Sequence, residues 1–511
     1  KGCKKSLAGT HENPVIYTEN GPVVGQKNYS VGQNKTYYAF RGIPYAEPPT
    51  GNLRFRVRSE DCLFINVYTP NVEAVNLSVI VWIYGGAFVS GSASYDSYAP
   101  DYLLDEDVVF VSFNYRVGIF GFLSTGDEAC PGNWALKDQV LALEWVRDNI
   151  AFFGGNADNV TVLGQSAGAA SVHYLLQTNK TRGLFNAAIM HSGSSLNLWA
   201  LNRRAQTTAF SVGASLGIST TNSSSLVEAL RKIGYEQLQT TSFITSTLVA
   251  LGNALEGLFY GPVIEPECEG ALFVYKSDQL LSEGHFHRVP VIMGFTSNEA
   301  SAVGNIPSIL RIYLLGYDLQ PDKYAPADLT NIIEDRQEAG TIIKEHYFGP
   351  DGGASLDLDA AVKFVSDDQF NRPIRRAVLD QSKYVPVYLY EFSHQGPLSG
   401  IENRPFSGVG HAEDISYIFR SPVANVTEAD EVVSSRMIRM WTNFVKHGNP
   451  TPKEDPLLKN ITWIATGSNS SALNYLNIGS ELALLKNPFE ESMTFYDEIY
   501  SEYGDPPYDT Y

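Results

Sequence analysis

Hydrophobic residues along this chain gather in short runs in which apolar and polar side chains do not alternate. "VIVWIY" and "VVFVSFN" are the strongest examples. Continuous apolar runs of this length are typical of strands that are buried on both faces of a sheet. The runs predict six such strands, at residues 79–84, 108–114, 160–163, 187–190, 289–294 and 385–392.

Helical patterns lie between these runs. The clearest is at residues 135–150, where apolar residues recur at helical spacing before the stop signal Gly154-Gly155. Strands that alternate with helices predict an α/β fold with a large, mostly parallel central sheet and helices on both faces. The chain has no internal repeat and no long low-complexity linker. We therefore expect one integrated domain over residues 1–511, with a disordered acidic tail at 504–511.

The charge of the chain narrows the range of partners. Its formal net charge is −19 at pH 7, and an acidic surface repels nucleic acid and anionic membranes. No apolar run reaches about 18 residues, so no membrane span is predicted. The first 15 residues lack the hydrophobic stretch of a signal peptide, so in a secreted protein we expect that peptide to have been removed already.

Nine Asn-x-Ser/Thr sequons point to a secreted, glycosylated surface. Asn159 is the exception, because it enters a predicted core strand. The remaining candidates for glycosylation are Asn28, Asn34, Asn76, Asn179, Asn222, Asn425, Asn460 and Asn469.

Cysteines and histidines do not form a metal-binding pattern. Four cysteines allow three full pairings, and the spacing does not choose among them. His285-x-His287 comes closest to a pair of metal ligands, but we expect neither a metal nor a cofactor. The cysteines are Cys3, Cys62, Cys130 and Cys268.

One motif carries chemistry. "GQSAG" at residues 164–168 stands between a predicted strand and a helical stretch, with Ser166 at its centre. In α/β sheets functional groups gather at the carboxyl ends of the strands. Small residues at 164 and 168 permit a sharp turn that exposes the serine as a nucleophile. An ordinary Gly/Ser turn is the alternative explanation.

A serine nucleophile needs a base and donors for the developing oxyanion. Gly85-Gly86-Ala87 follows the strong strand at 79–84, and consecutive small residues let backbone N–H groups approach a substrate oxygen. A tight loop without any function would have the same composition.

Longer stretches resemble the cholinesterase and carboxylesterase family of type-B carboxylesterases, which have the α/β-hydrolase fold, and most of all the insect carboxylesterases. They follow the family's order over nearly the whole chain. The stretches are "FRGIPYAEPPTGNLRF" (40–55), "SEDCLFINVYTP" (59–70), "VWIYGGAFVSG" (81–91), "NYRVGIFGFLSTGD" (114–127), the segment 132–168, "GFTSNEA" (294–300), "GVGHAEDISYIF" (408–419) and "MWTNFVKHGNPTP" (440–452).

The resemblance implies a catalytic triad of Ser166, Glu299 and His411, in the chain order that α/β-hydrolases use. It implies that His411 accepts the serine proton and that Glu299 orients the imidazole. It also implies oxyanion donors at the backbone N–H groups of Gly86, Ala87 and Ala167. Ser192 matches a serine behind the acid, and the resemblance assigns no role to His191.

Four positions bear on specificity. Cholinesterases have a glutamate where this chain has Gln165, so the resemblance argues against choline esters. Ala87 replaces a glycine, as is common in insect carboxylesterases. Trp199 matches an aromatic residue of the acyl pocket, although core packing explains it equally well. After Arg58 relatives carry a longer segment with a cysteine partner for Cys62; that segment is either lost or, as we favour, omitted from the sequence.

Two classes of function follow. The first is a secreted serine carboxylesterase that cleaves small to medium apolar esters, with juvenile hormone esterase as one alternative and triacylglycerol lipase as another. The second is a non-enzymatic, neuroligin-like adhesion or binding protein. The three triad positions favour the first class. The only partner expected is a small ester, and the sequence does not predict an oligomeric state.

Overall fold

The computed structural model of the chain describes residues 8–10, 13–47, 62–73, 76–250, 255–301, 314–401, 403–419, 425–467 and 472–511. Cys3, Asn469 and the junction after Arg58 lie outside these ranges. Among the described residues, no helix is both long enough and apolar enough to cross a membrane.

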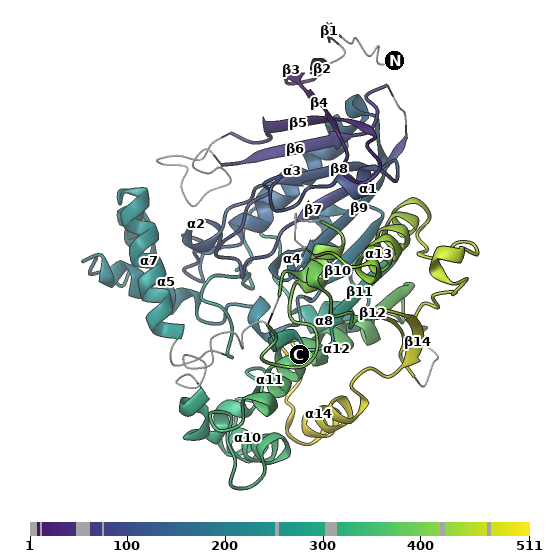
Figure 1. Cartoon of the computed structure of the whole chain (residues 1–511). Coiled ribbons are helices and arrows are strands. Elements are labelled where there is room, and N and C mark those ends of the chain that lie inside the picture. The colour runs from purple at the N-terminus through teal and green to yellow at the C-terminus, as the bar shows by residue number, and fades with distance from the viewer. Residues whose placement is uncertain are drawn as a thin grey trace.

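An 11-stranded sheet forms the centre of the molecule, in the order β14-β13-β12-β11-β10-β9-β7-β8-β6-β5-β4 (Figure 1). The six predicted strands lie side by side in it and run parallel, which confirms the predicted fold class. All residues of β8, β10 and β11 are buried, as the unbroken apolar runs require. The six are β7 (Leu77–Ile83), β8 (Val109–Phe113), β9 (Gly155–Gln165), β10 (Ala187–His191), β11 (Val291–Thr296) and β12 (Val387–Phe392).

Weaker strands complete both edges. β13 (Asn474–Ile478) continues the parallel part, and β14 (Leu482–Lys486) pairs antiparallel with it. At the other edge β4 (Gln26–Tyr29), β5 (Thr36–Pro44) and β6 (Phe64–Thr69) are antiparallel. A separate three-stranded sheet contains β1 (Ala8–Thr10), β2 (Asn13–Thr18) and β3 (Gly21–Val24). Edge strands such as β4 and β14 are partly exposed, so their sequences carry a weaker apolar signal.

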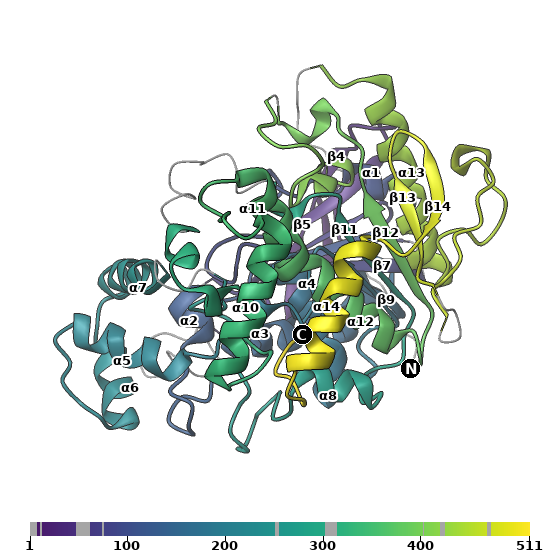
Figure 2. The ribbon, with the colours of Figure 1, turned by 90° about the horizontal axis from the view of Figure 1, so that it is seen from below.

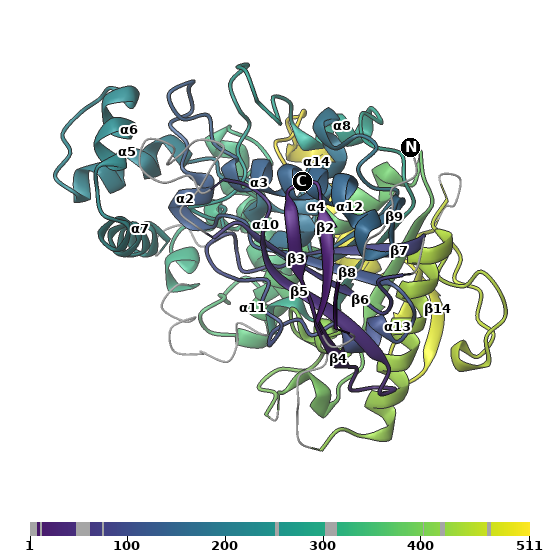
Figure 3. The ribbon, with the colours of Figure 1, turned by 90° about the horizontal axis from the view of Figure 1, so that it is seen from above.

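Helices cover both faces of the central sheet (Figures 1 and 3). On one face lie α3 (Trp134–Asn149), α4 (Ala167–Gln177) and α12 (Arg372–Gln381), and on the other lie α1 (Asp101–Leu104) and α13 (Glu428–His447). The predicted helix at 135–150 is α3. A 3-10 turn, Ile150–Phe153, follows it and ends at Gly154, which has a left-handed φ of 92°. Further helices are α2 (Gly118–Phe122), α5 (Ala205–Ser215), α6 (Ser223–Arg231), α7 (Tyr235–Ala250), α8 (Ser277–Ser282), α10 (Ile333–Phe348), α11 (Leu358–Ser366) and α14 (Glu490–Tyr503).

The tail at 504–511 corrects an expectation, because it is not a disordered segment but is packed against the body beside α12 and α14 (Figure 2). Tyr508 and Tyr511 are buried, and the Tyr511 ring stacks on Tyr500 with centroids 4.3 Å apart. The Tyr511 N–H donates to Leu196 O at 3.0 Å.

Charge complementarity explains why an acidic tail is ordered here. Asp509 lies 3.2 Å from Lys276 Nζ and 3.7 Å from Arg203 Nε. The guanidinium groups of Arg372 and Arg376 lie over the Tyr511 ring, 5.5 and 4.6 Å from its centroid. Composition indicated a segment that stays solvated, but it could not reveal the cationic surface on which the tail packs.

We expect Tyr511→Ala to destabilise the protein, because it empties a buried aromatic site and removes the face on which two guanidinium groups lie. Loss of a buried aromatic side chain costs about 3–5 kcal/mol. Scanning calorimetry should show a lowered Tm. The control is Tyr29→Ala, at a tyrosine that is 56% exposed, which should leave the Tm nearly unchanged. Equal melting of the two variants would contradict a packed tail.

Candidate active site

Ser166 occupies a strained turn between β9 and α4. Its φ of 57° and ψ of −124° lie outside the regions that L-residues favour. Such a conformation persists only where the surrounding structure enforces it, and it is frequent at functional sites. The turn places Ser166 at the N-terminus of α4, at the carboxyl end of a central strand.

Close backbone packing explains the small residues of GQSAG. A Cβ on Gly168 would lie 2.0 Å from Ile83 O, and one on Gly164 would lie 2.4 Å from Gly168 O. Just after β10, a Cβ on Gly193 would lie 2.5 Å from Ser166 O. These contacts leave no room for side chains, so the motif is more than an ordinary Gly/Ser turn.

His411 and Glu299 form a hydrogen-bonded pair. Glu299 follows β11, and its Oε2 lies 2.6 Å from His411 Nδ1. Glu299 is fully buried, and its other oxygen accepts the N–H of Thr296 at 2.8 Å. The His411 N–H donates to Glu299 O at 3.0 Å, so backbone and side chain both join the two loops. The imidazole keeps 21% exposure, enough for a substrate to reach it.

Gln165 lies against the opposite side of the imidazole. Its Nε2 is 3.1 Å from His411 Nε2. An amide nitrogen is only a donor, so His411 Nε2 accepts, and the ring proton is on Nδ1 facing Glu299. This is the tautomer that a general base requires. Gln165 thus adds no charge beside the base, which agrees with its interpretation as a neutral replacement for glutamate.

The loop at 85–88 supplies free backbone donors beside Ser166. A Cβ on Gly85 would lie 2.9 Å from Ser166 Cβ, so the loop touches the turn. Gly86, Ala87 and Phe88 have positive φ values of 120°, 52° and 61°. Successive N–H groups in such a backbone can point to one side and form a concavity that binds an anion. In the described part of the chain, the N–H groups of Gly86 and Ala87 have no acceptor. Ala167 opens α4, where N–H groups lack a helical partner.

Aromatic side chains wall one side of the imidazole. Phe370 lies 4.9 Å from His411 and 5.8 Å from Trp199, ring centroid to centroid. Trp199 is 9% exposed and its indole N–H donates to Gln369 O at 3.0 Å, so it is both packed and joined to this wall. Phe370 belongs to a π-helical turn, Asp367–Asn371, between α11 and α12. Sequence reasoning missed Phe370, since "SDDQFNRP" gives no sign of a π-turn, a feature frequent at functional sites.

Ser192 matches, by resemblance, a serine behind the acid, but no hydrogen bond between its side chain and Glu299 supports that role. It is buried with φ 55°, and its N–H donates to Gly294 O at 2.8 Å. Its hydroxyl has no hydrogen-bond partner among the described residues. Its hydroxyl therefore makes no hydrogen bond to the carboxylate of Glu299.

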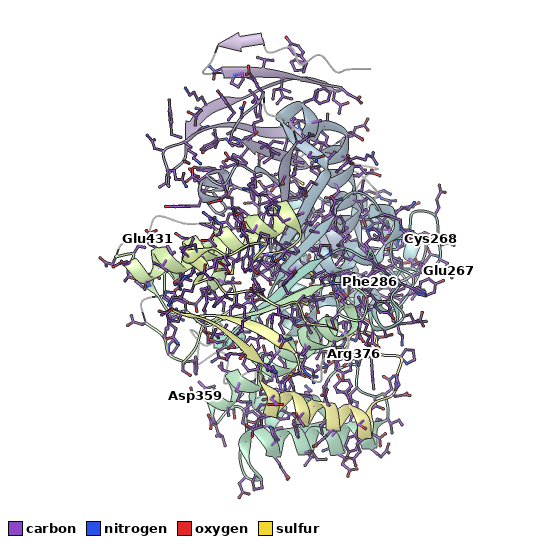
Figure 4. All side chains as sticks on the ribbon, turned by 90° about the vertical axis from the view of Figure 1, so that its right-hand side faces the viewer. Glu267, Cys268, Phe286, Asp359, Arg376 and Glu431 are labelled. Carbon is purple, nitrogen blue, oxygen red and sulfur yellow. The ribbon has the colours of Figure 1, made fainter. Side chains whose placement is uncertain are left out.

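A large groove lies at the other end of α4. It has a volume of about 970 Å³, and its lining includes Gln177, Phe286, His287 and Pro290. Phe286 is labelled to the right of the centre in Figure 4. Gln177 ends the 11-residue helix that Ser166 begins, roughly 16 Å away at 1.5 Å per residue. The groove is therefore separate from the Ser166 site. Over the described ranges no cluster of three metal-ligating side chains occurs.

Most predicted glycosylation positions are on the surface. Asn159 is partly buried and its amide donates to Ser78 Oγ at 2.9 Å, which fits its exclusion. Asn28 is half-exposed. The exposed candidates are Asn34, Asn76, Asn179, Asn222, Asn425 and Asn460.

The sheet order, the turn that carries Ser166 and the site at the carboxyl ends of the strands define the chain as an α/β-hydrolase. Within that class the chain belongs to the carboxylesterase family. The "Carboxylesterase family" model matches residues 12–58 and 56–496. The two matched segments meet at the place where the sequence departs from the longer segment of its relatives.

Named relatives agree with this assignment. Juvenile hormone esterase of Tribolium castaneum is 32% identical, with 89% of this chain and 86% of the relative covered. Cocaine esterase of Homo sapiens is 31% identical over 86% of this chain and 84% of the relative. The crystal structure of juvenile hormone esterase from Manduca sexta, with OTFP covalently attached, superposes with a TM-score of 0.84 at 28% identity, covering 96% of this chain and all of that one. The chain is a carboxylic ester hydrolase, so the non-enzymatic alternative is set aside.

We expect Gly86→Ala to lower kcat, because a Cβ there would lie 2.2 Å from Ser90 O and would displace the loop donors. Loss of one oxyanion donor typically costs about 10²–10³ in rate. Gly217→Ala is the matched control, since Gly217 also has a positive φ but nothing within 4 Å of its Cβ position. Steady-state hydrolysis of p-nitrophenyl acetate measures both, and equal activity would rule out a role for Gly86.

Proposed function

We propose that this chain is a secreted serine carboxylesterase that hydrolyses small to medium apolar esters through an acyl-enzyme on Ser166. The observation that carries the proposal is the His411–Glu299 pair, 2.6 Å apart, whose other ring nitrogen lies 3.1 Å from the amide of Gln165, the residue before the strained Ser166. The Nδ1–H tautomer gives His411 Nε2 a free lone pair. That lone pair accepts from the Gln165 amide here, so the amide has to move aside before the nitrogen takes the Ser166 proton.

The reaction begins when Ser166 Oγ attacks the ester carbonyl carbon and its proton passes to His411 Nε2. The oxyanion receives hydrogen bonds from the N–H groups of Gly86, Ala87 and Ala167. The ester C–O bond then breaks, and His411 donates the proton to the leaving alcohol. Water then attacks the carbonyl carbon of the acyl-enzyme while His411 Nε2 accepts its proton. The bond to Ser166 Oγ breaks, His411 donates the proton to that oxygen, and the carboxylic acid is released. Glu299 stabilises the imidazolium throughout.

The surroundings of the imidazole support apolar substrates. Phe370 and Trp199 provide an aromatic wall, and Gln165 contributes no charge that would attract a quaternary ammonium. Juvenile hormone is the second candidate substrate class. Two relatives, one similar in sequence and one in structure, are named for hydrolysis of that hormone.

The substrate is tested by a graded ester panel, from p-nitrophenyl acetate to octanoate, with a juvenile hormone and butyrylthiocholine. We expect the highest kcat/KM for apolar esters and little cleavage of butyrylthiocholine. Ser166→Ala and His411→Ala should each reduce kcat by about 10⁴ or more without lowering the Tm, because each removes a group that acts on the reacting atoms. Activity that survives in Ser166→Ala would refute the acyl-enzyme on Ser166. A dominant preference for the hormone would select the second candidate.

Secretion is tested through the sequons. Exposed asparagines such as Asn34 and Asn222 are accessible to glycosylation, so protein secreted from insect cells should lose apparent mass on treatment with peptide N-glycosidase. The Asn159→Gln variant is the control and should show the same mass loss as the wild type. With a signal peptide placed before the chain, a protein that is still retained in the cells, with no mass change, would contradict secretion.

A further inference from the structure

His191 joins the nucleophile to the loop of the base. It ends β10, is fully buried, and its backbone oxygen accepts the N–H of Ser166 at 2.8 Å. Its side chain points to the other partner, because its Nδ1 lies 2.7 Å from an oxygen of Asp414, three residues after His411. One residue therefore contacts the serine turn through its backbone and the histidine loop through its ring.

The ring of His191 is fixed at both nitrogens. Trp441 on α13 donates its indole N–H to His191 Nε2 at 2.8 Å. An indole N–H is only a donor, so Nε2 accepts, and the ring proton is on Nδ1, directed to Asp414. Tyr390 on β12 closes the cluster with its hydroxyl 2.9 Å from the same carboxylate oxygen and 2.6 Å from His191 Nδ1. The ring is thus a neutral bridge with a single orientation.

Asp414 is a buried carboxylate kept ionised by this bridge. Burial raises the pKa of its carboxyl, but the interactions with His191, the hydroxyl of Tyr390 and His411 together hold that pKa below the usual range. The charge of Asp414 therefore acts on His411, the group that becomes an imidazolium during the reaction. Charged or titratable groups that face Asp414 from the neighbouring elements are His191, Tyr390 and His411, while α13 contributes the neutral Trp441.

We propose that His191 is a positioning residue: by holding Asp414 it keeps the loop of His411 in register with Ser166 and supplies a second carboxylate field to the imidazolium. This rests on the proposed function, because it assigns His411 as the base. Glu299 contacts the imidazole directly, whereas His191 acts only through Asp414 and the Ser166 backbone.

The experiment compares His191→Ala, His191→Gln and Asp414→Asn in the pH profile of kcat/KM for p-nitrophenyl butyrate. Loss of the carboxylate field disfavours the imidazolium, so the midpoint of the acid limb should move to lower pH in His191→Ala and Asp414→Asn, by roughly half a pH unit or more. We expect kcat to fall about 10- to 100-fold with KM nearly unchanged, because misplacement affects the reacting groups and not the binding of ester.

His191→Gln should recover most of this loss. Its amide N–H can donate to Asp414, and its carbonyl can accept from Trp441, so the bridge is retained without an imidazole. His173→Ala is the matched control. His173 is equally buried but its Nδ1 contacts Ser195, so this change should lower the Tm and leave the midpoint in place. If His191→Ala does not fold, the proposal is tested by Asp414→Asn alone, through the midpoint of the acid limb of its kcat/KM profile.

Three results would overturn the proposal: an unchanged midpoint in Asp414→Asn, a loss confined to KM, or the same shift in His173→Ala as in His191→Ala. In those cases wild-type activity that depends on Ser166 would still support the proposed function, and only the positioning role of His191 would be refuted. Wild-type protein without esterase activity, or with activity that survives Ser166→Ala, would instead remove both proposals.

Discussion

The strained backbone of Ser166 is the constraint on which the site depends. An L-residue holds φ 57° and ψ −124° only if its neighbours fit closely around it, and here they fit without room for a single additional carbon. Gly168 lies against the backbone of β7, and Gly193, beyond β10, lies against Ser166 itself. The central strands therefore hold the turn in this conformation, in which Ser166 stays partly accessible to solvent.

Electrostatics in the site follow from where the carboxylates are buried. Glu299 and Asp414 are both without exposure, and each is paired with a different histidine. A carboxylate in a low-dielectric interior interacts more strongly with a nearby positive charge than it would in water. Of these two histidines, only His411 keeps access to solvent. In the proposed mechanism the positive charge therefore develops on the imidazole that a substrate can reach. Gln165 keeps that face neutral.

The parallel core and the pairing of Glu299 with His411 could be predicted from the sequence and its resemblance, but the contacts that support them could not. Unbroken apolar runs reveal a strand buried on both faces, and GQSAG between a strand and a helix is a local pattern. Glu299 and His411 have no such local signal and were assigned by resemblance. Phe370 and His191 were missed or left without a role, because their importance depends on contacts with residues far along the chain. The tail was misjudged for the same reason: its acidic composition is local, whereas the cations that hold it come from α8, α12 and the loop after Trp199.

Tyr511 bonds to the backbone of Leu196, three residues before Trp199, and shares Arg372 with the turn that presents Phe370. The tail at 504–511 thus contacts the segments that carry Trp199 and Phe370, the two aromatic rings beside the imidazole. Related esterases could change their substrate range by exchanging residues of this tail, which support the aromatic wall without contacting the substrate. A comparison restricted to pocket-lining positions would then overlook part of what shapes selectivity in such an enzyme.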